Sequence, residues 1–435
     1  MGGCCSCEIS CGGKVIRHMD DREYGRPERE DIAYGDSEAR IRLRGSSKFV
    51  SMYCQQGSKG INQDALTVWE GFSGEKDTIF CGVFDGHGPL GHKVSQYIRD
   101  NLPAKLAESI KMSQQKKVSK LWDPYPRDRS SHVNVSGQND QNMSLASWER
   151  SLVKSFNEMD EDVARDINTD SFSSGTTAVT VIQQGDQLII ANLGDSRAVL
   201  CTRGDNDELN PVQLTVDLKP DIPSEAMRIQ NCEGRVFSAA EESQVYRIYM
   251  PEEDCPGLAM SRAFGDFCLK DYGLISVPDV FYRKITKLDE FVVLATDGVW
   301  DVLSNAEVIS IVASAPRSMA AKMLVRHAVS VWRYKHPNAK IDDCTVICLF
   351  LHEQPTLPDS PSARSNIRQG KNLRNEGTES LVDDDKSSVI TLGQELDGRG
   401  RLSRANSVSY SKYPRLSTVV SRKSSQCVDG VVEVQ

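Results

Sequence analysis

The chain has 435 residues, of which 39% are apolar, and it carries a formal net charge of −9. Its apolar content can fill a sizeable core, whereas its acidic balance disfavours nucleic-acid binding, which needs a basic surface. The sequence shows no apolar run of 18 residues and no secretory signal peptide, so we expect an intracellular protein without a membrane span.

Residues 1–44 are rich in glycine, cysteine and charge and lack periodicity, which predicts a flexible N-terminal arm. The first six residues, MGGCCS, fit the pattern for myristoylation of Gly2. Cys4, Cys5 and Cys7 are candidate palmitoylation sites, and a second acyl chain is needed for stable anchoring. The arm therefore favours a membrane surface as a partner, at the cytoplasmic face of the plasma membrane, with the cytosol or the nucleus as alternative locations.

Beyond the arm, short runs of β-forming residues alternate with amphipathic stretches. We predict strands over residues 78–84, 178–183, 187–193, 197–202, 291–296 and 345–351. Helices are predicted over residues 91–110 with a break at Pro103, over 147–166 and over 318–332. A polar segment over 113–141 is typical of a surface insertion.

Residues 178–202 contain three of these strands, separated by Gly185-Asp186 and by Gly194-Asp195. Two tight turns so close together predict an antiparallel meander rather than β-α-β units. We expect one domain over residues 45–353. A polar, serine-rich tail over residues 354–435 has too little apolar sequence to fold, which predicts disorder.

Acidic residues stand at predicted turns and strand ends beside glycines and small residues: Asp64, Asp85, Asp195, Asp297, Asp301 and Asp343. A single Asp-Gly pair more often marks a turn than a ligand. Two such pairs, each ending an apolar strand, favour instead a site for a hard cation, because Mg²⁺ and Mn²⁺ prefer oxygen ligands. The scarcity of histidine and the absence of paired CxxC motifs disfavour zinc.

In the motifs that contain these aspartates, the chain resembles the type 2C metal-dependent protein serine/threonine phosphatases, in particular their plant-type members. The matching strings follow the order found in that family: GSKGINQDA (57–65), VFDGHG (83–88), SSGTTAV (173–179), ANLGDSRAVL (191–200), LAMSRAFGD (258–266), VVLATDGVWDVLS (292–304) and DDCTVICL (342–349). The resemblance implies an α+β fold, a four-layer αββα sandwich of two antiparallel sheets flanked by helices, with metals at one edge.

The resemblance also implies two Mg²⁺ or Mn²⁺ ions and a weaker third. Asp85 would bridge the two ions, Gly86 would offer its carbonyl, and Asp297 and Asp343 would complete the site. Asp64 would act through metal-bound water. Asp195 and Asp301, together with Asp297, match the third ion position.

For catalysis, the resemblance makes His87 the general acid and places Lys59 where many relatives carry a phosphate-binding arginine. A proton donor helps because the departing alkoxide is strongly basic. Three positions depart from the family pattern: Gln63 replaces a common glutamate, Lys59 cannot form the bidentate contact of an arginine, and Cys344 stands where asparagine is common.

These features predict a monomeric, membrane-tethered phosphatase that acts on phosphoserine and phosphothreonine in protein substrates. Two alternatives belong to other classes. An inactive relative could shelter phosphorylated partners as a binding module, a reading to which Gln63 and Lys59 lend some weight. A metal nuclease is disfavoured because the chain is acidic and lacks a basic groove.

Overall fold

The computed structural model describes residues 31–34, 39–121, 143–166, 171–238, 245–253 and 257–353. All of them belong to one compact unit. The proposed acylation sites Gly2, Cys4 and Cys5 and the predicted tail over residues 354–435 lie outside the described residues. In the ranges given above, none of the helices has the length and apolar character that a membrane span requires.

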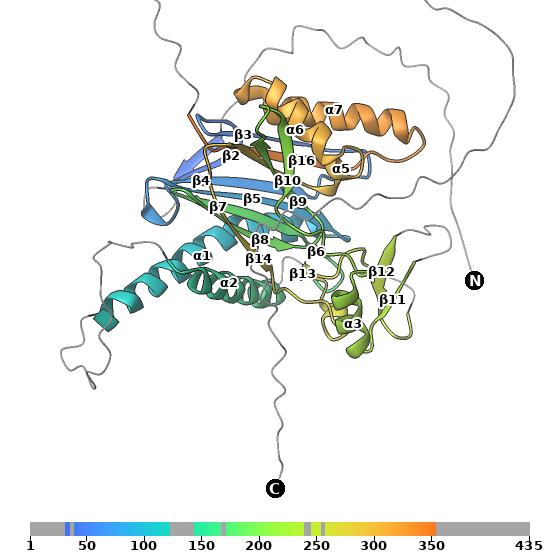
Figure 1. Ribbon diagram of the computed structural model, residues 1–435. Helices are drawn as coiled ribbons and strands as arrows, with labels where there is room; N and C mark the ends of the chain where they lie inside the picture. Colours follow the sequence, from blue (N-terminus) through green and yellow to red (C-terminus); the bar gives the residue numbers. More distant parts are fainter. Residues whose placement is uncertain are drawn as a thin grey trace, which may run out of the picture. The chain divides into compact units, whose positions relative to one another are not determined.

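The strands of this unit pair antiparallel in a continuous sheet that curls into two facing halves (Figure 1). The first half contains, in spatial order, β4 (Asp64–Glu70), β5 (Thr78–His87), β7 (Ala178–Gln184), β8 (Gln187–Leu193) and β14 (Asp279–Lys284). The second half contains β3 (Val50–Gln55), β16 (Cys344–Phe350), β15 (Asp289–Ala295), β9 (Arg197–Arg203) and β10 (Leu209–Gln213).

One strand, β2 (Arg40–Ser46), joins the two halves by pairing with β4 through residues 40–42 and with β3 through Gly45 and Ser46. At the far end of β5, the two-residue strand β6 (Gly175–Thr176) pairs with Gly86 and His87 and also with β13 (Phe264–Gly265). These short pairs bring three distant parts of the chain to the end of β5.

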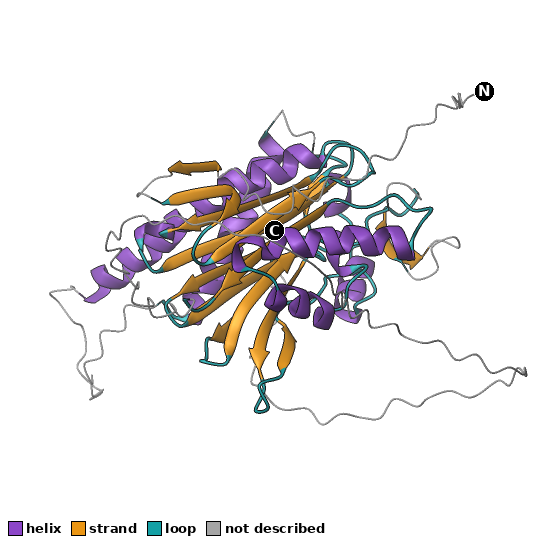
Figure 2. Ribbon diagram, turned by 90° about the horizontal axis from the view of Figure 1, so that it is seen from above, coloured by secondary structure: helices purple, strands orange, loops and turns teal. Residues whose placement is uncertain are grey.

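The α-helices are α1 (Gly91–Leu121), α2 (Leu145–Arg165), α3 (Pro223–Asn231), α4 (Phe267–Lys270), α5 (Asp297–Trp300), α6 (Asn305–Ser314) and α7 (Ala320–Lys335). The longer helices α1, α2, α6 and α7 lie on the two outer faces of the curled sheet (Figure 1). Helices α1 and α2 cover the first half, whereas α6 and α7 lie across the strands of the second, as the view from above shows (Figure 2).

Strand alternation sends apolar side chains to both faces of each half. In β5, Phe80 and Phe84 pack into the cluster beneath α1 and α2, whereas Cys81 and Val83 pack between the two halves. A third cluster fills the space between the second half and α5, α6 and α7. The layers are therefore helix, sheet, sheet and helix, which confirms the predicted α+β sandwich.

A small sheet of β11 (Arg235–Ser238) and β12 (Tyr246–Tyr249) stands apart from the main sheet, next to α3. It has an apolar cluster of its own, which includes Ile229, Ile248 and Leu269. This unit is therefore stabilised separately from the sandwich.

Pro103 does not interrupt α1, which runs unbroken from Gly91 to Leu121, so the predicted break was wrong. A proline inside a helix removes one hydrogen bond and costs about 3 kcal/mol. The same helix buries Ile98, Leu102, Leu106 and Ile110 almost completely. Because each such side chain contributes about 1.5–3 kcal/mol on burial, the packing of this face outweighs the cost of the proline.

The predicted meander over residues 178–202 is only half correct. Strands β7 and β8 form the expected hairpin, but β9 pairs with β10 and β15 in the other half of the sheet. The turn at Gly194, where φ is +97°, thus carries the chain from one half to the other. The two dipeptides look alike in sequence, and only tertiary packing distinguishes a hairpin from a crossing.

The folded unit begins earlier than predicted, because β1 (Asp31–Tyr34) and β2 contain residues that the sequence had assigned to the flexible arm over 1–44. Alternating charges made this segment resemble an exposed arm. In the structure Arg42 is nevertheless only 3% exposed, and its guanidinium lies 3.8 Å from the Glu70 carboxylate.

Glu225 of α3, which packs beside the small sheet, binds the segment that directly precedes β13. Its carboxylate accepts hydrogen bonds from Arg262 Nη2 (2.8 Å), Arg262 Nε (2.9 Å) and Ser261 Oγ (2.8 Å), and Arg228 pairs with it at 2.8 Å. Burial opposes the charge, but the hydrogen bonds and charge of Arg262 outweigh burial and lower the pKa of Glu225 to about 2.

Replacing Glu225 by Gln should destabilise the protein by about 3 kcal/mol at pH 7, because it removes the buried charge that pairs with both Arg262 and Arg228 and leaves Asp279 as the remaining carboxylate partner of Arg262. A carboxyl whose folded pKa is depressed stabilises the protein above its unfolded pKa and loses this effect as the pH falls through the folded pKa. The difference in unfolding free energy between wild type and Glu225→Gln should therefore shrink from pH 4.5 to about 2.

Urea unfolding at several pH values measures this difference. Glu158→Gln, at an exposed helical pair with Lys154, serves as the matched control and should change stability by less than about 0.5 kcal/mol. A difference between wild type and Glu225→Gln that stays constant over this pH range would contradict the assignment.

Candidate metal centre

The acidic side chains gather where the two halves of the sheet meet. Asp64 opens β4 and lies opposite Asp85 in the register with β5. Asp297 opens α5, with one residue between it and the end of β15. Thr296 links the halves, because its hydroxyl donates to Asp64 Oδ2 at 2.9 Å and accepts from the Thr345 N–H at 3.1 Å. Ends of strands from both halves thus converge at one place, as expected for these three residues.

Asp85 and Asp297 lie at the centre of this group, close enough for the charge of Asp297 to act on Asp85. Burial raises the pKa of Asp85 well above its ordinary value, and repulsion from Asp297 and Asp64 adds to this. Burial likewise raises the pKa of Asp297, with repulsion from Asp195 and Asp301. Because like charges this close disfavour full ionisation, a bound cation would stabilise the group strongly.

Asp64 is 8% exposed, and burial followed by repulsion from Asp343 raises the pKa of its carboxyl to about 7. Two glycines let the strand ends approach this closely. A Cβ on Gly86 would lie 2.5 Å from the Gln63 carbonyl oxygen, and a Cβ on Gly298 would lie 2.0 Å from that of Asp343. Side chains at these positions would push the strand ends apart.

The structure assigns different tasks to Asp342 and Asp343. The carboxylate of Asp343 accepts two backbone N–H groups, that of Gly57 at 2.7 Å and that of Gln63 at 2.9 Å. Asp342 instead pairs with the Lys59 ammonium, and its charge contributes to the raised pKa values of Asp85 and Asp297. Asp343 therefore fixes the loop over residues 57–63, and Asp342, which the sequence analysis did not select, belongs to the acidic group.

His87, the last residue of β5, donates from Nε2 to Asp266 Oδ2 at 2.5 Å. Burial opposes the imidazolium, but the Asp266 carboxylate outweighs burial and raises the pKa of His87 above its ordinary value. Asp266 is buried and follows β13 with φ of +50°. Gly175 makes room for this pair, because a Cβ there would lie 2.1 Å from Asp266 Oδ2. Asp266 is the last residue of the LAMSRAFGD motif, but nothing in the sequence indicates its role beside His87.

Two lysines neutralise part of the acidic group. Lys59, whose side chain is 56% exposed, contacts Asp342 as described. Lys219 donates from Nζ to Asp195 Oδ2 at 2.8 Å, and sequence reasoning did not select it. Asp301 lies just after α5 and is exposed at the edge of the group.

In the described ranges, no three Asp, Glu, His or Cys side chains already form a ligand set. Lysines, a threonine hydroxyl and backbone N–H groups contact the carboxylates instead. The residues still fit a hard divalent cation, because the donors are all oxygens and because Asp195 Oδ1 is buried without a hydrogen-bond partner among the described residues. The repulsion among Asp85, Asp297 and Asp64 is what such an ion would relieve.

Comparisons with known proteins show the family of this chain. The model of the family "Protein phosphatase 2C" matches residues 48–333. "Probable protein phosphatase 2C 65" of Arabidopsis thaliana is 53% identical over 358 residues, covering 82% of this chain and 89% of that protein. "Probable protein phosphatase 2C 73" of Oryza sativa subsp. japonica is also 53% identical, over 312 residues, covering 72% of this chain and 74% of the relative.

Among solved structures, a serine-threonine phosphatase 2C from Toxoplasma gondii aligns with a TM-score of 0.61 and 25% identity. The alignment covers 74% of this chain and 99% of that one. A C. elegans sex determining protein shares the fold at a TM-score of 0.52 and 23% identity, covering 71% of this chain and 66% of that one. The chain belongs to the protein phosphatase 2C family and is a protein serine/threonine phosphatase, a hydrolase.

Proposed function

We propose that this enzyme removes phosphate from phosphoserine and phosphothreonine in proteins at the acidic group, with Mg²⁺ or Mn²⁺ as its cofactor. Asp85, Asp297 and Asp342 would hold two ions, with the carbonyl of Gly86 as a further ligand and Asp64 beside them. When bound, such a pair of ions supplies an activated water and neutralises the charge of the phosphate. The observation that carries the proposal is the convergence of Asp64, Asp85 and Asp297 at the junction of the two halves, where Asp64 lies opposite Asp85 and accepts from the Thr296 hydroxyl.

The neighbouring side chains suit the remaining steps. His87, whose imidazolium is stabilised by Asp266, can donate a proton to the departing serine or threonine oxygen. Lys59 presents an exposed ammonium beside the acidic group, where it can attract the phosphate dianion. Asp343 has the supporting task of fixing the loop that carries Lys59 and Asp64.

The proposal extends to location and assembly. The MGGCCS start supports acylation of Gly2 and of Cys4 and Cys5, and hence a membrane-tethered enzyme at the cytoplasmic face of the plasma membrane. We expect a monomer that takes phosphorylated proteins as substrates.

Asp85→Asn and Asp342→Asn should each lower Mn²⁺-dependent turnover of a phosphopeptide on the order of 10²-fold and weaken Mn²⁺ binding, because each removes a charged ligand. Neither change should lower the unfolding temperature, since each relieves repulsion. Asp343→Asn should instead lower the unfolding temperature, because its carboxylate holds two backbone N–H groups.

Calorimetric Mn²⁺ titration and thermal unfolding of the three variants separate these roles. Unchanged Mn²⁺ affinity in Asp342→Asn, together with lost affinity in a folded Asp343→Asn, would reverse the assignment of the two neighbours. Wild-type turnover in Asp85→Asn would refute the proposed centre altogether.

His87→Gln should slow phosphopeptide hydrolysis far more than hydrolysis of an aryl phosphate, whose leaving group needs little protonation. Asp266→Asn should show the same selective loss, because it removes the partner that holds the imidazole. The ratio of the two rates is the measurement. Equal losses on both substrates would exclude His87 as the proton donor.

Gly2→Ala should release the full-length protein into the soluble fraction of cells, because myristoylation precedes stable anchoring. Replacing Cys4, Cys5 and Cys7 by Ser should release it partly, since one acyl chain binds with a constant of only about 10⁴ M⁻¹. Turnover should be unchanged in both. Fractionation decides the point, and a wild-type protein found wholly in the soluble fraction would rule out the tether.

A further inference from the structure

Asp195 lies at the crossing between the two halves of the sheet, in the turn from β8 to β9. It is 4% exposed, and its Oδ2 accepts a hydrogen bond from Lys219 Nζ at 2.8 Å. Its Oδ1 is buried and has no hydrogen-bond partner in the part of the chain that the structure describes. The ion pair thus occupies the side of the acidic group that also faces Asp297 and Asp301.

The backbone that carries Lys219 is fixed to this crossing. The Leu218 N–H donates to the Gly194 carbonyl at 2.9 Å, and Asn192 Nδ2 donates to the Val216 carbonyl at 2.8 Å. Leu218 is itself buried, and its carbonyl accepts from Ser261 Oγ at 2.9 Å. The backbone around Lys219 is therefore held by hydrogen bonds on both sides, and this positions its side chain beside Asp195.

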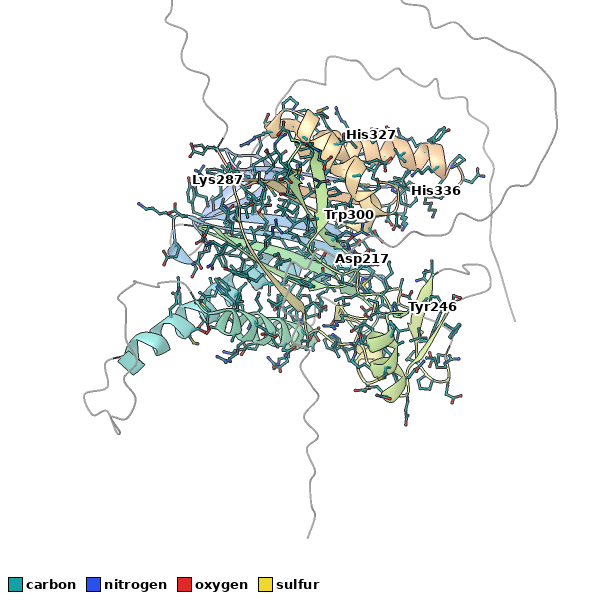
Figure 3. The ribbon with its side chains drawn as sticks, viewed as in Figure 1. Asp217, Tyr246, Lys287, Trp300, His327 and His336 are labelled. Carbon is teal, nitrogen blue, oxygen red and sulfur yellow. The ribbon has the colours of Figure 1, made fainter. Side chains whose placement is uncertain are left out.

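Arg197 connects the same segment to the helix that carries two of the aspartates. Its guanidinium binds Asp217, with Nη2 to Oδ2 at 2.5 Å, and lies 5.0 Å from the centre of the Trp300 ring in α5. Figure 3 labels Asp217 and Trp300. Asp297 opens α5 and Asp301 follows it. The lysine and the carboxylates around it are thus parts of one framework.

The ion pair places a positive charge beside Asp195. A lysine side chain is an ammonium at neutral pH, and Nζ of Lys219 lies 2.8 Å from Asp195 Oδ2. A divalent ion binding Asp195 must displace this ammonium or bind beside it against repulsion, and either reduces its affinity.

We propose that Lys219 is a resident cation of the centre, which competes with a third divalent ion for Asp195 and so restricts the enzyme to two tightly bound ions. The inference rests on the proposed function, because it assumes that Asp85, Asp297 and Asp342 hold a pair of ions. Lys219 would thus set how many ions bind, and at what metal concentration a third ion binds.

Titration of the full-length protein with Mn²⁺, followed by isothermal calorimetry, tests the proposal by counting ions without reference to turnover. The wild type should bind two ions tightly. Lys219→Met, which keeps the length of the side chain but removes its charge, should bind a third ion at least about tenfold more tightly than the wild type does, after allowance for solvent screening. Lys219→Gln should behave in the same way, and Lys219→Arg should resemble the wild type.

Two further variants make the test specific. Lys284→Met removes the lysine from an exposed pair with Asp186 (3.5 Å) and should leave the Mn²⁺ isotherm unchanged. Lys219→Met combined with Asp195→Asn should lose the third ion again. The inference is overturned if folded Lys219→Met and Lys219→Gln bind the same number of ions as the wild type with the same affinities, or if Lys219→Arg gains a third ion. A wild type that binds no Mn²⁺ at all would defeat the proposed function as well.

Discussion

The candidate metal centre of this protein depends on one constraint: its carboxylates repel one another because they are held close together away from water. Asp85 and Asp297 come from different halves of the sheet, yet the charge of Asp297 acts on Asp85. Such an arrangement is unfavourable by itself, and the surrounding sandwich has to impose it. The apolar cluster between the halves and the hydrogen bond from Thr296 to Asp64 hold the carboxylates in place against this repulsion. Two lysines then reduce the repulsion, each at a different side of the group.

The sandwich was predicted from the resemblance to a phosphatase family, whereas most of its strands and the candidate aspartates were predicted from local patterns. Apolar runs that end in Asp-Gly identify Asp85 and Asp297 directly, since each carboxylate stands at a strand end. The fold errors came from positions where local and tertiary signals differ. Nothing near Gly194 distinguishes a crossing from a hairpin, and Pro103 is a local breaker that the packing of α1 overrides.

The parts of the site that sequence missed act through partners far away in the chain. Asp342 and Asp343 are adjacent acids, and only the N–H groups of Gly57 and Gln63 reveal which of the two supports the loop. Asp266 is separated from His87 by 179 positions, and Lys219 carries none of the signals used to select acidic ligands. The roles of these residues follow from their contacts with distant parts of the chain, and residue type alone does not reveal them.

The small sheet next to α3 has an apolar cluster that shares no residue with the three clusters of the sandwich. Substitutions in that cluster can therefore alter the surface it supports without loosening the packing that holds the carboxylates. The strip over residues 261–266 is the exception, because Arg262 binds Glu225 of α3 and Asp266 binds His87. Substitutions in the small sheet can therefore change its surface, whereas substitutions in residues 261–266 would disturb the contact that orients His87.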